Sequence, residues 1–233
     1  MSDGVVARYR EVRERIERAC DRYGRDPASV RLVAISKLQS AEAVAAVAGA
    51  GQEDFGENYL QEAEAKREAL ASAGHGNLRW HMTGHLQRRK AKAAAGAFEL
   101  IHTVDSVALA DALERHLGDA GLTQRVLLQV NIGGEEQKSG VAPEGLAQLA
   151  EHIIGSCPRL RLEGLMCLPP VWDAGDEARP HFARCRGLLE SLRRIFGLGM
   201  PELSMGMSGD FEAAVAEGAT LVRIGSAIFG PRS

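Results

Sequence analysis

The sequence predicts an α/β fold in which eight parallel strands alternate with helices and close into a single (β/α)8 TIM-type barrel. Short apolar runs recur along the chain, and Ala-rich or Leu-rich segments with helical spacing lie between them. Gly, Asn and Pro mark the joins. The length of 233 residues suits this fold, since such barrels commonly run to about 250 residues. No linker or low-complexity block divides the sequence, so we expect one domain over residues 1–233.

The same alternation could instead form an open, doubly wound sheet. Such a sheet usually carries a Gly-rich fingerprint directly after its first strand. Here that turn reads Lys37-Leu38-Gln39-Ser40. The number of strands and the chain length therefore favour the barrel.

The elements follow in a regular order. An extra amphipathic helix opens the chain over Tyr9–Tyr23, has Val12, Ile16 and Ala19 on one side, and ends at Gly24. The strands are expected at Leu32–Ser36, Glu53–Gly56, Arg79–Thr83, Leu100–Val104, Val126–Asn131, Leu162–Met166, Glu202–Met205 and Leu221–Ile224. The helices between them are expected at Ala41–Gly49, Tyr59–Leu70, Val107–Leu117, Leu146–Ile154, Ala183–Phe196 and Phe211–Ala216.

Composition excludes several classes of protein. Hydrophobic residues make up 45% and charged residues 25%, and the formal charge of −3 gives no reason to expect nucleic acid or an anionic membrane as a partner. No apolar stretch approaches the roughly 20 residues of a membrane span, and residues 1–18 lack the apolar core of a signal peptide. The four cysteines are widely separated, which indicates reduced thiols rather than disulfides or a metal site. We therefore expect a cytoplasmic protein without a metal.

Lys37 follows the first strand directly, and an ammonium group is costly to bury, so we expect it where the strand ends open into a site. Side chains alternate along a strand, so Val33, Ile35 and Lys37 share one face. If that face looks into the barrel, the amine stands at the mouth, where it can form a Schiff base with an aldehyde. A surface lysine that merely marks the strand end is the alternative.

Glycine and hydroxyl residues follow the last two strands. Gly206-Met207-Ser208-Gly209 comes after strand seven, and Gly225-Ser226 comes after strand eight. Small residues let backbone N–H groups approach an anion, and a phosphate held after strands seven and eight recurs in barrels. The alternative is two ordinary tight turns, with Ser208 as a helix N-cap. The presence of both loops on adjacent strands favours phosphate.

Arg223 lies within the last strand and alternates with Val222 and Ile224. If those two side chains face the helices, Arg223 points into the barrel mouth, where its guanidinium needs an acceptor. A carboxylate such as Glu57 or Glu202 could serve, and so could a ring nitrogen of a bound cofactor. His81, His102 and His152 are expected to be structural histidines.

A lysine for an aldehyde, loops for a phosphate and an inward arginine together describe a site for pyridoxal 5′-phosphate. The chain resembles the pyridoxal phosphate homeostasis proteins, the YggS or PROSC type, which are similar to the isolated barrel domain of alanine racemase. The resemblance lies in Leu32–Lys37, Phe55–Tyr59, Trp80–Gln87, Gln129–Asn131, Lys138–Gly140, Gly164–Met166, Leu203–Glu212 and Val222–Gly230. It spans nearly the whole chain.

This resemblance implies roles for particular residues. Lys37 would be the cofactor lysine, and Arg223 would face the pyridine nitrogen. Four residues would hold the phosphate, namely Met207, Ser208, Gly225 and Ser226. Two would line the ring, namely Asn58 and His85. Gly209 departs from the family, which often has Ser or Thr at that place.

The resemblance leaves a choice between a carrier and an enzyme. An arginine at the ring nitrogen makes the ring a poorer electron sink, and the chain offers no obvious second acid or base and no room for the second domain of alanine racemase. We therefore expect a monomeric protein, not an enzyme, that stores pyridoxal phosphate, delivers it to apo-enzymes and protects the cell from the free aldehyde. The alternatives are a small racemase-like enzyme using Lys37 with Tyr59 or His85, and a Schiff-base aldolase of sugar phosphates.

Overall fold

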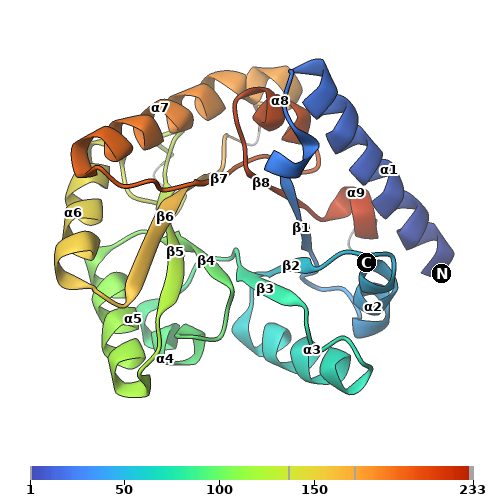
Figure 1. The fold of residues 1–233 in the computed structure, drawn as a ribbon, viewed down its shortest axis with the longest axis horizontal. Helices are drawn as coiled ribbons and strands as arrows, with labels where there is room; N and C mark the ends of the chain where they lie inside the picture. The colour runs from blue at the N-terminus through green and yellow to red at the C-terminus, as the bar shows by residue number, and fades with distance from the viewer. Residues whose placement is uncertain (1, 136, 171, 231–233) are drawn as a thin grey trace.

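The computed structural model describes residues 2–135, 137–170 and 172–230. Its centre is a closed barrel of eight parallel strands in sequential order, each hydrogen-bonded to the next, with β8 returning to β1 (Figure 1). The prediction of a (β/α)8 barrel is thus confirmed. The strands are β1 Arg31–Ile35, β2 Asp54–Glu57, β3 Arg79–Met82, β4 Leu100–Val104, β5 Gln124–Val130, β6 Leu160–Cys167, β7 Glu202–Ser204 and β8 Leu221–Ile224.

Helices surround the barrel, and the opening helix lies beside α8 and α9 (Figure 1). They are α1 Ser2–Arg22, α2 Ala41–Gly49, α3 Leu60–Ser72, α4 Ala91–Ala94, α5 Val107–Ala120, α6 Leu146–Ser156, α7 Arg179–Phe196, α8 Phe211–Ala216 and α9 Ser226–Phe229. Short 3-10 turns occur at Pro27–Ser29, Arg88–Lys90, Pro143–Gly145 and Gly175–Ala178. Among the described residues, no helix is long and apolar enough to cross a membrane.

Several predicted boundaries differ from the structure. The opening helix starts at Ser2 rather than at Tyr9, and the helix after β6 starts at Arg179 rather than at Ala183. The short helix α4 was not predicted, because a single turn of Ala and Lys carries no apolar stripe. The end of α1 is as expected, since Gly24 adopts a left-handed φ of 64° that closes the helix.

Two apolar layers hold the fold together. Between the sheet and the helices lies the main core, to which β1 contributes Leu32 and Ala34. Inside the barrel lies a smaller cluster around Val33, with Ile35 packed against it. This alternation confirms that Val33 and Ile35 face the barrel interior, and it directs the next inward position, Lys37, toward the barrel mouth.

Candidate functional site

A cavity of about 320 Å³ opens at the end of the barrel where the strands terminate. It lies between the loops that follow β1, β7 and β8. Its walls combine one amine, one guanidinium, two hydroxyls and several glycines, namely Ile35, Lys37, Gln39, Met207, Ser208, Gly209, Arg223, Gly225, Ser226 and Gly230. Six of the eight residues predicted from the sequence therefore meet in one cavity, from segments that are far apart along the chain.

The loop that carries Lys37 is held by side chains of the helix α3. Lys66, on α3, donates a hydrogen bond to the backbone carbonyl of Ser36, and the backbone N–H of Leu38 donates to the carboxylate of Glu62. Leu38 itself adopts a left-handed φ of 62°, which is uncommon for a residue with a branched side chain. Lys37, which is half-buried, thus sits between two backbone groups held by side chains of one helix.

Glu57 completes this anchor. It is fully buried and accepts hydrogen bonds from the Ser36 hydroxyl at 2.7 Å and from the Lys66 ammonium at 2.8 Å. Burial raises the pKa of Glu57, although the hydrogen bonds from Lys66 and Ser36 act in the opposite direction. Glu57 therefore supports the Lys37 loop from outside the barrel and is not the partner of Arg223 that the sequence allowed.

Arg223 is held inside the barrel by two acceptors. One guanidinium nitrogen donates to Ser204 Oγ at 2.7 Å and the other terminal nitrogen donates to the backbone carbonyl of Cys167 at 2.9 Å. The side chain is buried, and this desolvation lowers its pKa. Within the described part of the chain no carboxylate lies at ion-pair distance from it, and Glu202, which the sequence offered as a partner, pairs with Arg31 instead. Since a guanidinium has five N–H donors, Arg223 keeps donors for an acceptor in the cavity.

The two glycine-containing loops are joined to each other. Ser208, after β7, accepts a hydrogen bond from the backbone N–H of Ala227, after β8, at 3.2 Å. Ser208 is therefore not the N-cap of α8, a place taken by Asp210. Gly206 has a φ of 90°, and a Cβ there would lie 2.6 Å from the Cβ of Ala214. Glycine is required at this turn, which brings backbone and hydroxyl groups to the cavity wall.

Two predicted residues lie outside the cavity wall. The amide oxygen of Asn58 accepts a hydrogen bond from Thr83 Oγ1 at 3.1 Å. The His85 side chain is 50% exposed and lies 3.5 Å from a carboxylate oxygen of Asp105. Conversely, Gln39 and Gly230 line the cavity and were not predicted as site residues. The signal for Gln39 was its position two residues after Lys37, in the same loop.

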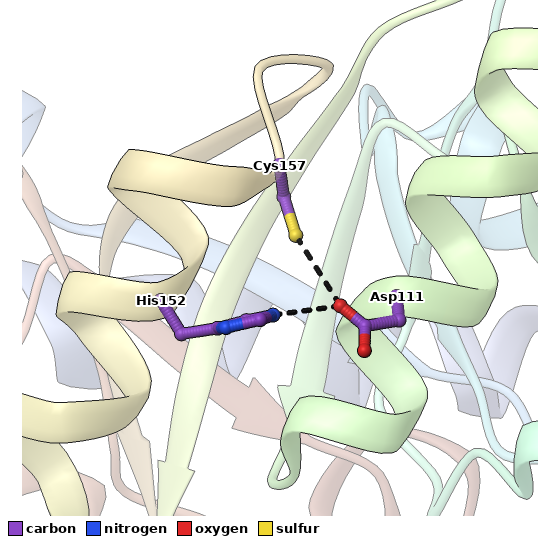
Figure 2. A group of neighbouring side chains, drawn as sticks. All are labelled: Asp111, His152 and Cys157. Carbon is purple, nitrogen blue, oxygen red and sulfur yellow. Dashed lines mark hydrogen bonds and ion pairs between the residues drawn. The ribbon is translucent and has the colours of Figure 1, made fainter.

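A second group of polar side chains lies on the outer surface, between α5 and α6 (Figure 2). Asp111, His152 and Cys157 place one possible metal ligand each within 4.8 Å of one another. However, His152 Nε2 lies only 2.6 Å from Asp111 Oδ1, whereas two ligands of one tetrahedral zinc ion would be about 3.3 Å apart. Burial raises the pKa of the Cys157 thiol to about 11, which disfavours the thiolate. The geometry is that of a hydrogen-bonded Asp–His pair, and we assign no metal to it.

The cavity fits a compound with an aldehyde, an aromatic nitrogen acceptor and a phosphate. Lys37 offers an amine, buried Arg223 offers donors without a carboxylate partner among the described residues, and the joined loops offer hydroxyls and backbone N–H groups. Its volume lies at the lower end of the range of small-molecule sites, about 300–1,000 Å³. These three elements are the ones that pyridoxal 5′-phosphate needs.

Comparison with known proteins agrees with this geometry. The family model of the alanine racemase N-terminal domain matches residues 9–233. A protein of Pseudomonas aeruginosa named pyridoxal phosphate homeostasis protein is 47% identical, and the match covers 98% of this chain and 96% of that protein. The structure of PipY from Synechococcus elongatus, solved with PLP bound, superposes with a TM-score of 0.80 at 37% identity and covers 93% of this chain and all of that one.

A more distant structure shows only the fold. Alanine racemase from Corynebacterium glutamicum superposes with a TM-score of 0.74 at 19% identity, and the match covers 98% of this chain but 61% of the racemase. The match to PipY and to the Pseudomonas protein, in contrast, extends over nearly the whole length of both partners. The chain therefore belongs to the family of pyridoxal phosphate homeostasis proteins, whose barrel is of the alanine racemase N-terminal type.

Proposed function

We propose that this protein binds pyridoxal 5′-phosphate through Lys37 and stores and delivers it in the cytoplasm, without turnover of amino acids. The observation that carries this proposal is the single cavity that gathers Lys37, Arg223 and the loops of Ser208 and Ser226. The names of the relatives and the PLP-bound PipY structure support it.

Each part of the cavity would have a separate task. When bound, the cofactor supplies an aldehyde that an amine can hold covalently and a ring that can withdraw electrons. Lys37 would hold the aldehyde carbon, and Arg223 would donate a hydrogen bond to the ring nitrogen. Met207, Ser208, Gly225 and Ser226 would surround the phosphate with backbone N–H and hydroxyl donors.

The arginine also bears on catalysis. A guanidinium cannot give up its proton in a protein, so it would act only as a donor toward the ring nitrogen and keep that nitrogen unprotonated. A neutral ring withdraws electrons less strongly than a protonated one. Arg223 would therefore favour binding over carbanion chemistry.

The cavity also offers few acids or bases. Of the residues described as lining it, only Lys37 and Arg223 carry a titratable side chain. Tyr59, the tyrosine nearest to a predicted site loop in sequence, is 50% exposed and does not line the cavity. General acid–base help typically contributes about 10²–10⁴-fold, so two-sided proton transfer, which needs a second acid or base on the other side of the substrate, would be slow in this cavity.

The test combines three measurements on the purified protein. The ultraviolet–visible spectrum with pyridoxal phosphate should show a lysine-bound chromophore. Incubation with a pyridoxal-dependent apo-enzyme should transfer the cofactor and restore activity of that enzyme. Incubation with a panel of L- and D-amino acids in deuterated water should give no exchange of the α-proton at ordinary enzyme rates.

The outcomes separate the candidate functions. Exchange that disappears in Lys37→Ala would establish a racemase-like enzyme and overturn the carrier. No chromophore with pyridoxal phosphate, but covalent trapping of a sugar phosphate on Lys37, would indicate an aldolase-type site.

A further inference from the structure

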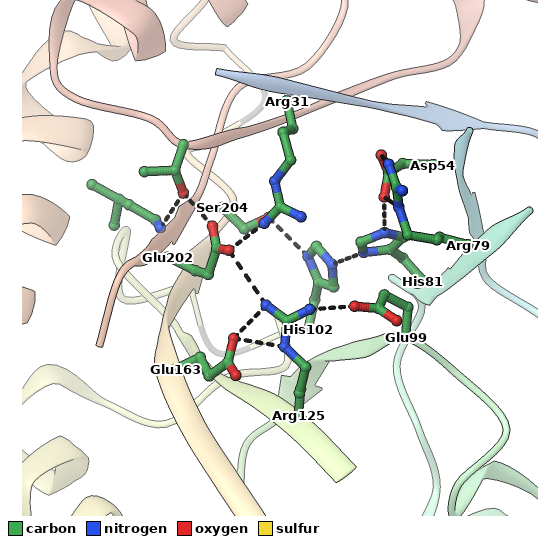
Figure 3. A network of polar contacts seen from close by, with 12 residues as sticks. Arg31, Asp54, Arg79, His81, Glu99, His102, Arg125, Glu163, Glu202 and Ser204 are labelled. Atoms are coloured by element: carbon green, nitrogen blue, oxygen red, sulfur yellow. Dashed lines mark hydrogen bonds and ion pairs between the residues drawn. The ribbon is translucent and has the colours of Figure 1, made fainter. Parts of the chain in front are cut away.

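A chain of hydrogen-bonded side chains crosses the interior of the barrel and ends at Arg223. From the opposite end of the barrel, Asp54 Oδ1 lies 2.9 Å from His81 Nε2, and His81 Nδ1 lies 3.0 Å from His102 Nε2. His102 Nδ1 lies 2.8 Å from Ser204 Oγ, which accepts the hydrogen bond from Arg223. Figure 3 shows the part from Asp54 to Ser204. The chain therefore links the far end of the barrel to the wall of the proposed cofactor cavity.

This arrangement is more polar than a structural core requires. His81, His102 and Ser204 are fully buried, and inside the barrel they share the space with an apolar cluster around Val33 and Leu100. A buried polar network is costly unless each member has its hydrogen-bond partners. Apolar side chains of similar volume would often stabilise the folded protein as much as such a network does. Its connection to Arg223 offers a functional reason for its presence.

The hydrogen bonds are best satisfied in one direction. Burial is the main cause that holds the pKa of His102 well below its ordinary value, so this ring is neutral and has one donor and one acceptor nitrogen. Ser204 Oγ accepts a hydrogen bond from Arg223, so the hydroxyl proton of Ser204 can be donated to His102 Nδ1. His102 Nε2–H then donates to His81, and His81 Nε2–H donates to Asp54.

The carboxylate at the end of the chain is well suited to accept. Burial raises the pKa of Asp54, but hydrogen bonds from Arg79 and His81 outweigh burial and hold it well below its usual range. Arg79 donates to this carboxylate through two nitrogens, at 2.9 and 2.7 Å. Asp54 is therefore a charged anchor that is itself fixed by an arginine.

We propose that Ser204, His102, His81 and Asp54 are positioning residues for Arg223, which they hold in the orientation that donates to the ring nitrogen of the bound cofactor. Ser204 Oγ and the Cys167 carbonyl fix two terminal nitrogens of the guanidinium, and the histidines fix the Ser204 hydroxyl. The inference rests on the proposed function, because it concerns the strength of one hydrogen bond to that ligand.

The test compares two ligands that differ only at the ring nitrogen. The protein is titrated with pyridoxal 5′-phosphate and with its 1-deaza analogue, in which a C–H group replaces the nitrogen, and the ratio of the two dissociation constants is measured. A well-oriented Arg223 should favour pyridoxal phosphate about tenfold or more. Ser204→Ala and His102→Leu should each reduce this preference by about fivefold or more, because the guanidinium loses its fixed orientation.

Two further variants separate positioning from stability. Ser204→Thr keeps the hydroxyl and should retain most of the preference. Thr103→Val is the matched control, since it removes a different buried hydroxyl, on β4, whose hydrogen bond goes to the Gly84 carbonyl at 2.8 Å and not to the hydrogen-bonded chain. It should lower thermal stability without changing the ratio. If Thr103→Val changes the ratio as much as Ser204→Ala does, the effect is structural and the inference is wrong.

An independent measurement needs no ligand. The ¹⁵N spectrum of labelled histidine in the free protein should show His102 as a neutral ring with its proton on Nε2. A proton on His102 Nδ1 would contradict the direction proposed for the chain. A failure of wild-type protein to bind pyridoxal phosphate would overturn the proposed function, whereas normal binding with an unchanged ratio in Ser204→Ala and His102→Leu would overturn only this inference.

Discussion

Lys37 and Arg223 come from neighbouring strands of the barrel, β1 and β8, and this explains how two cations share one cavity. Val33 pairs with Arg223 in the register of the two strands, so Lys37 lies further along the barrel toward the mouth. The buried guanidinium thus forms part of the inner wall, while the half-buried amine stands nearer the entrance. This difference in depth suits a deep donor for a ring nitrogen and an accessible nucleophile for an aldehyde.

The first prediction at this scale concerns Lys37. Borohydride reduction of wild-type protein with pyridoxal phosphate should leave a covalent adduct on Lys37, and Lys37→Ala should lose it completely. The free energy of unfolding should change by about 0.5 kcal/mol or less, because the side chain lies at the mouth and not in the core. Mass spectrometry of the reduced protein identifies the modified residue.

Lys138 provides the control for this experiment. It also lies in a loop after a strand, but its ammonium donates to the Pro169 carbonyl at 2.9 Å and pairs with Glu135. Lys138→Ala should keep the adduct. An adduct mapped to Lys138 in the wild type would show that the assignment of Lys37 is incorrect.

The second prediction concerns the exposed Ser226, at the start of α9. Ser226→Asp should weaken the binding of pyridoxal 5′-phosphate about tenfold or more, because a carboxylate repels a nearby phosphate dianion strongly. The affinity for unphosphorylated pyridoxal should fall much less. Titration of both ligands measures the difference.

Ser226→Asn matches the aspartate in size without its charge. It should affect the two ligands similarly and more weakly than Ser226→Asp. Equal losses of both ligands in Ser226→Asp would argue against a phosphate at this loop.

At the scale of elements, the opening helix α1 supports the loop that carries Ser226. Its buried face includes Val5, Tyr9 and Val12, and it packs along α8 and α9 (Figure 1). Arg8 Nε donates a hydrogen bond to the backbone carbonyl of Ile228, within α9, at 2.7 Å. Because α9 is only one turn long, this external contact fixes it more than its own hydrogen bonds can.

We therefore expect Arg8→Ala to loosen α9 and to weaken the binding of pyridoxal phosphate about threefold to tenfold, since an anion site depends on correctly placed N–H groups. Hydrogen exchange should become faster for residues 226–230. Arg10→Ala is the control, as Arg10 is exposed on the same helix and has the same charge. If both variants weaken binding equally, the loss comes from long-range charge rather than from the support of α9.

At the scale of the whole molecule, charged residues at the strand starts close the end of the barrel opposite the cavity, and Figure 3 shows the ion pairs among them. Arg31 pairs with Glu202, Arg125 pairs with Glu163 and Glu99, and Arg79 pairs with Asp54. The hydrogen bonds that Arg125 donates to Glu163 are the main cause that raises the pKa of Arg125. The barrel thus has one end sealed by ion pairs and one end open for a ligand, which is the usual division between stability and function in this fold.

This division predicts a pH dependence of stability. The folded-state pKa of Asp54 lies below the ordinary value of 3.8, so its contribution is fully present above that pH and is lost as the pH falls below it. Asp54→Asn should therefore be less stable than wild type near neutral pH, and the difference should shrink below about pH 4. Because one proton is involved, the difference in the free energy of unfolding should change by at most about 1.4 kcal/mol per pH unit.

Urea unfolding at several pH values measures this difference. The surface residue Asp21 offers a matched control, and the difference between wild type and Asp21→Asn should vary little with pH. A difference for Asp54→Asn that stays constant down to pH 2 would refute the role assigned to the carboxylate.

Much of the architecture follows from local sequence pattern alone. Alternating strand and helix periods predicted all eight strands of the barrel, and the period of two within a strand placed Val33, Ile35 and Arg223 on the inward face. The loops that end β1, β7 and β8 were also predicted to share one site, because the carboxyl ends of parallel strands meet at one end of a barrel. These conclusions need only the positions of residues along the chain.

The tertiary structure alone decided which side chains meet. Asn58 and His85 follow strands as the sequence showed, yet the closed barrel directs them to Thr83 and Asp105 and not to the cavity wall. His81 and His102 were expected to be structural histidines, and both are buried and hydrogen-bonded; the register of β3 and β4 and the closure of the barrel bring them into line with Ser204, which no local pattern indicated. Contacts across a barrel depend on shear and side-chain packing among all eight strands, which no local period contains.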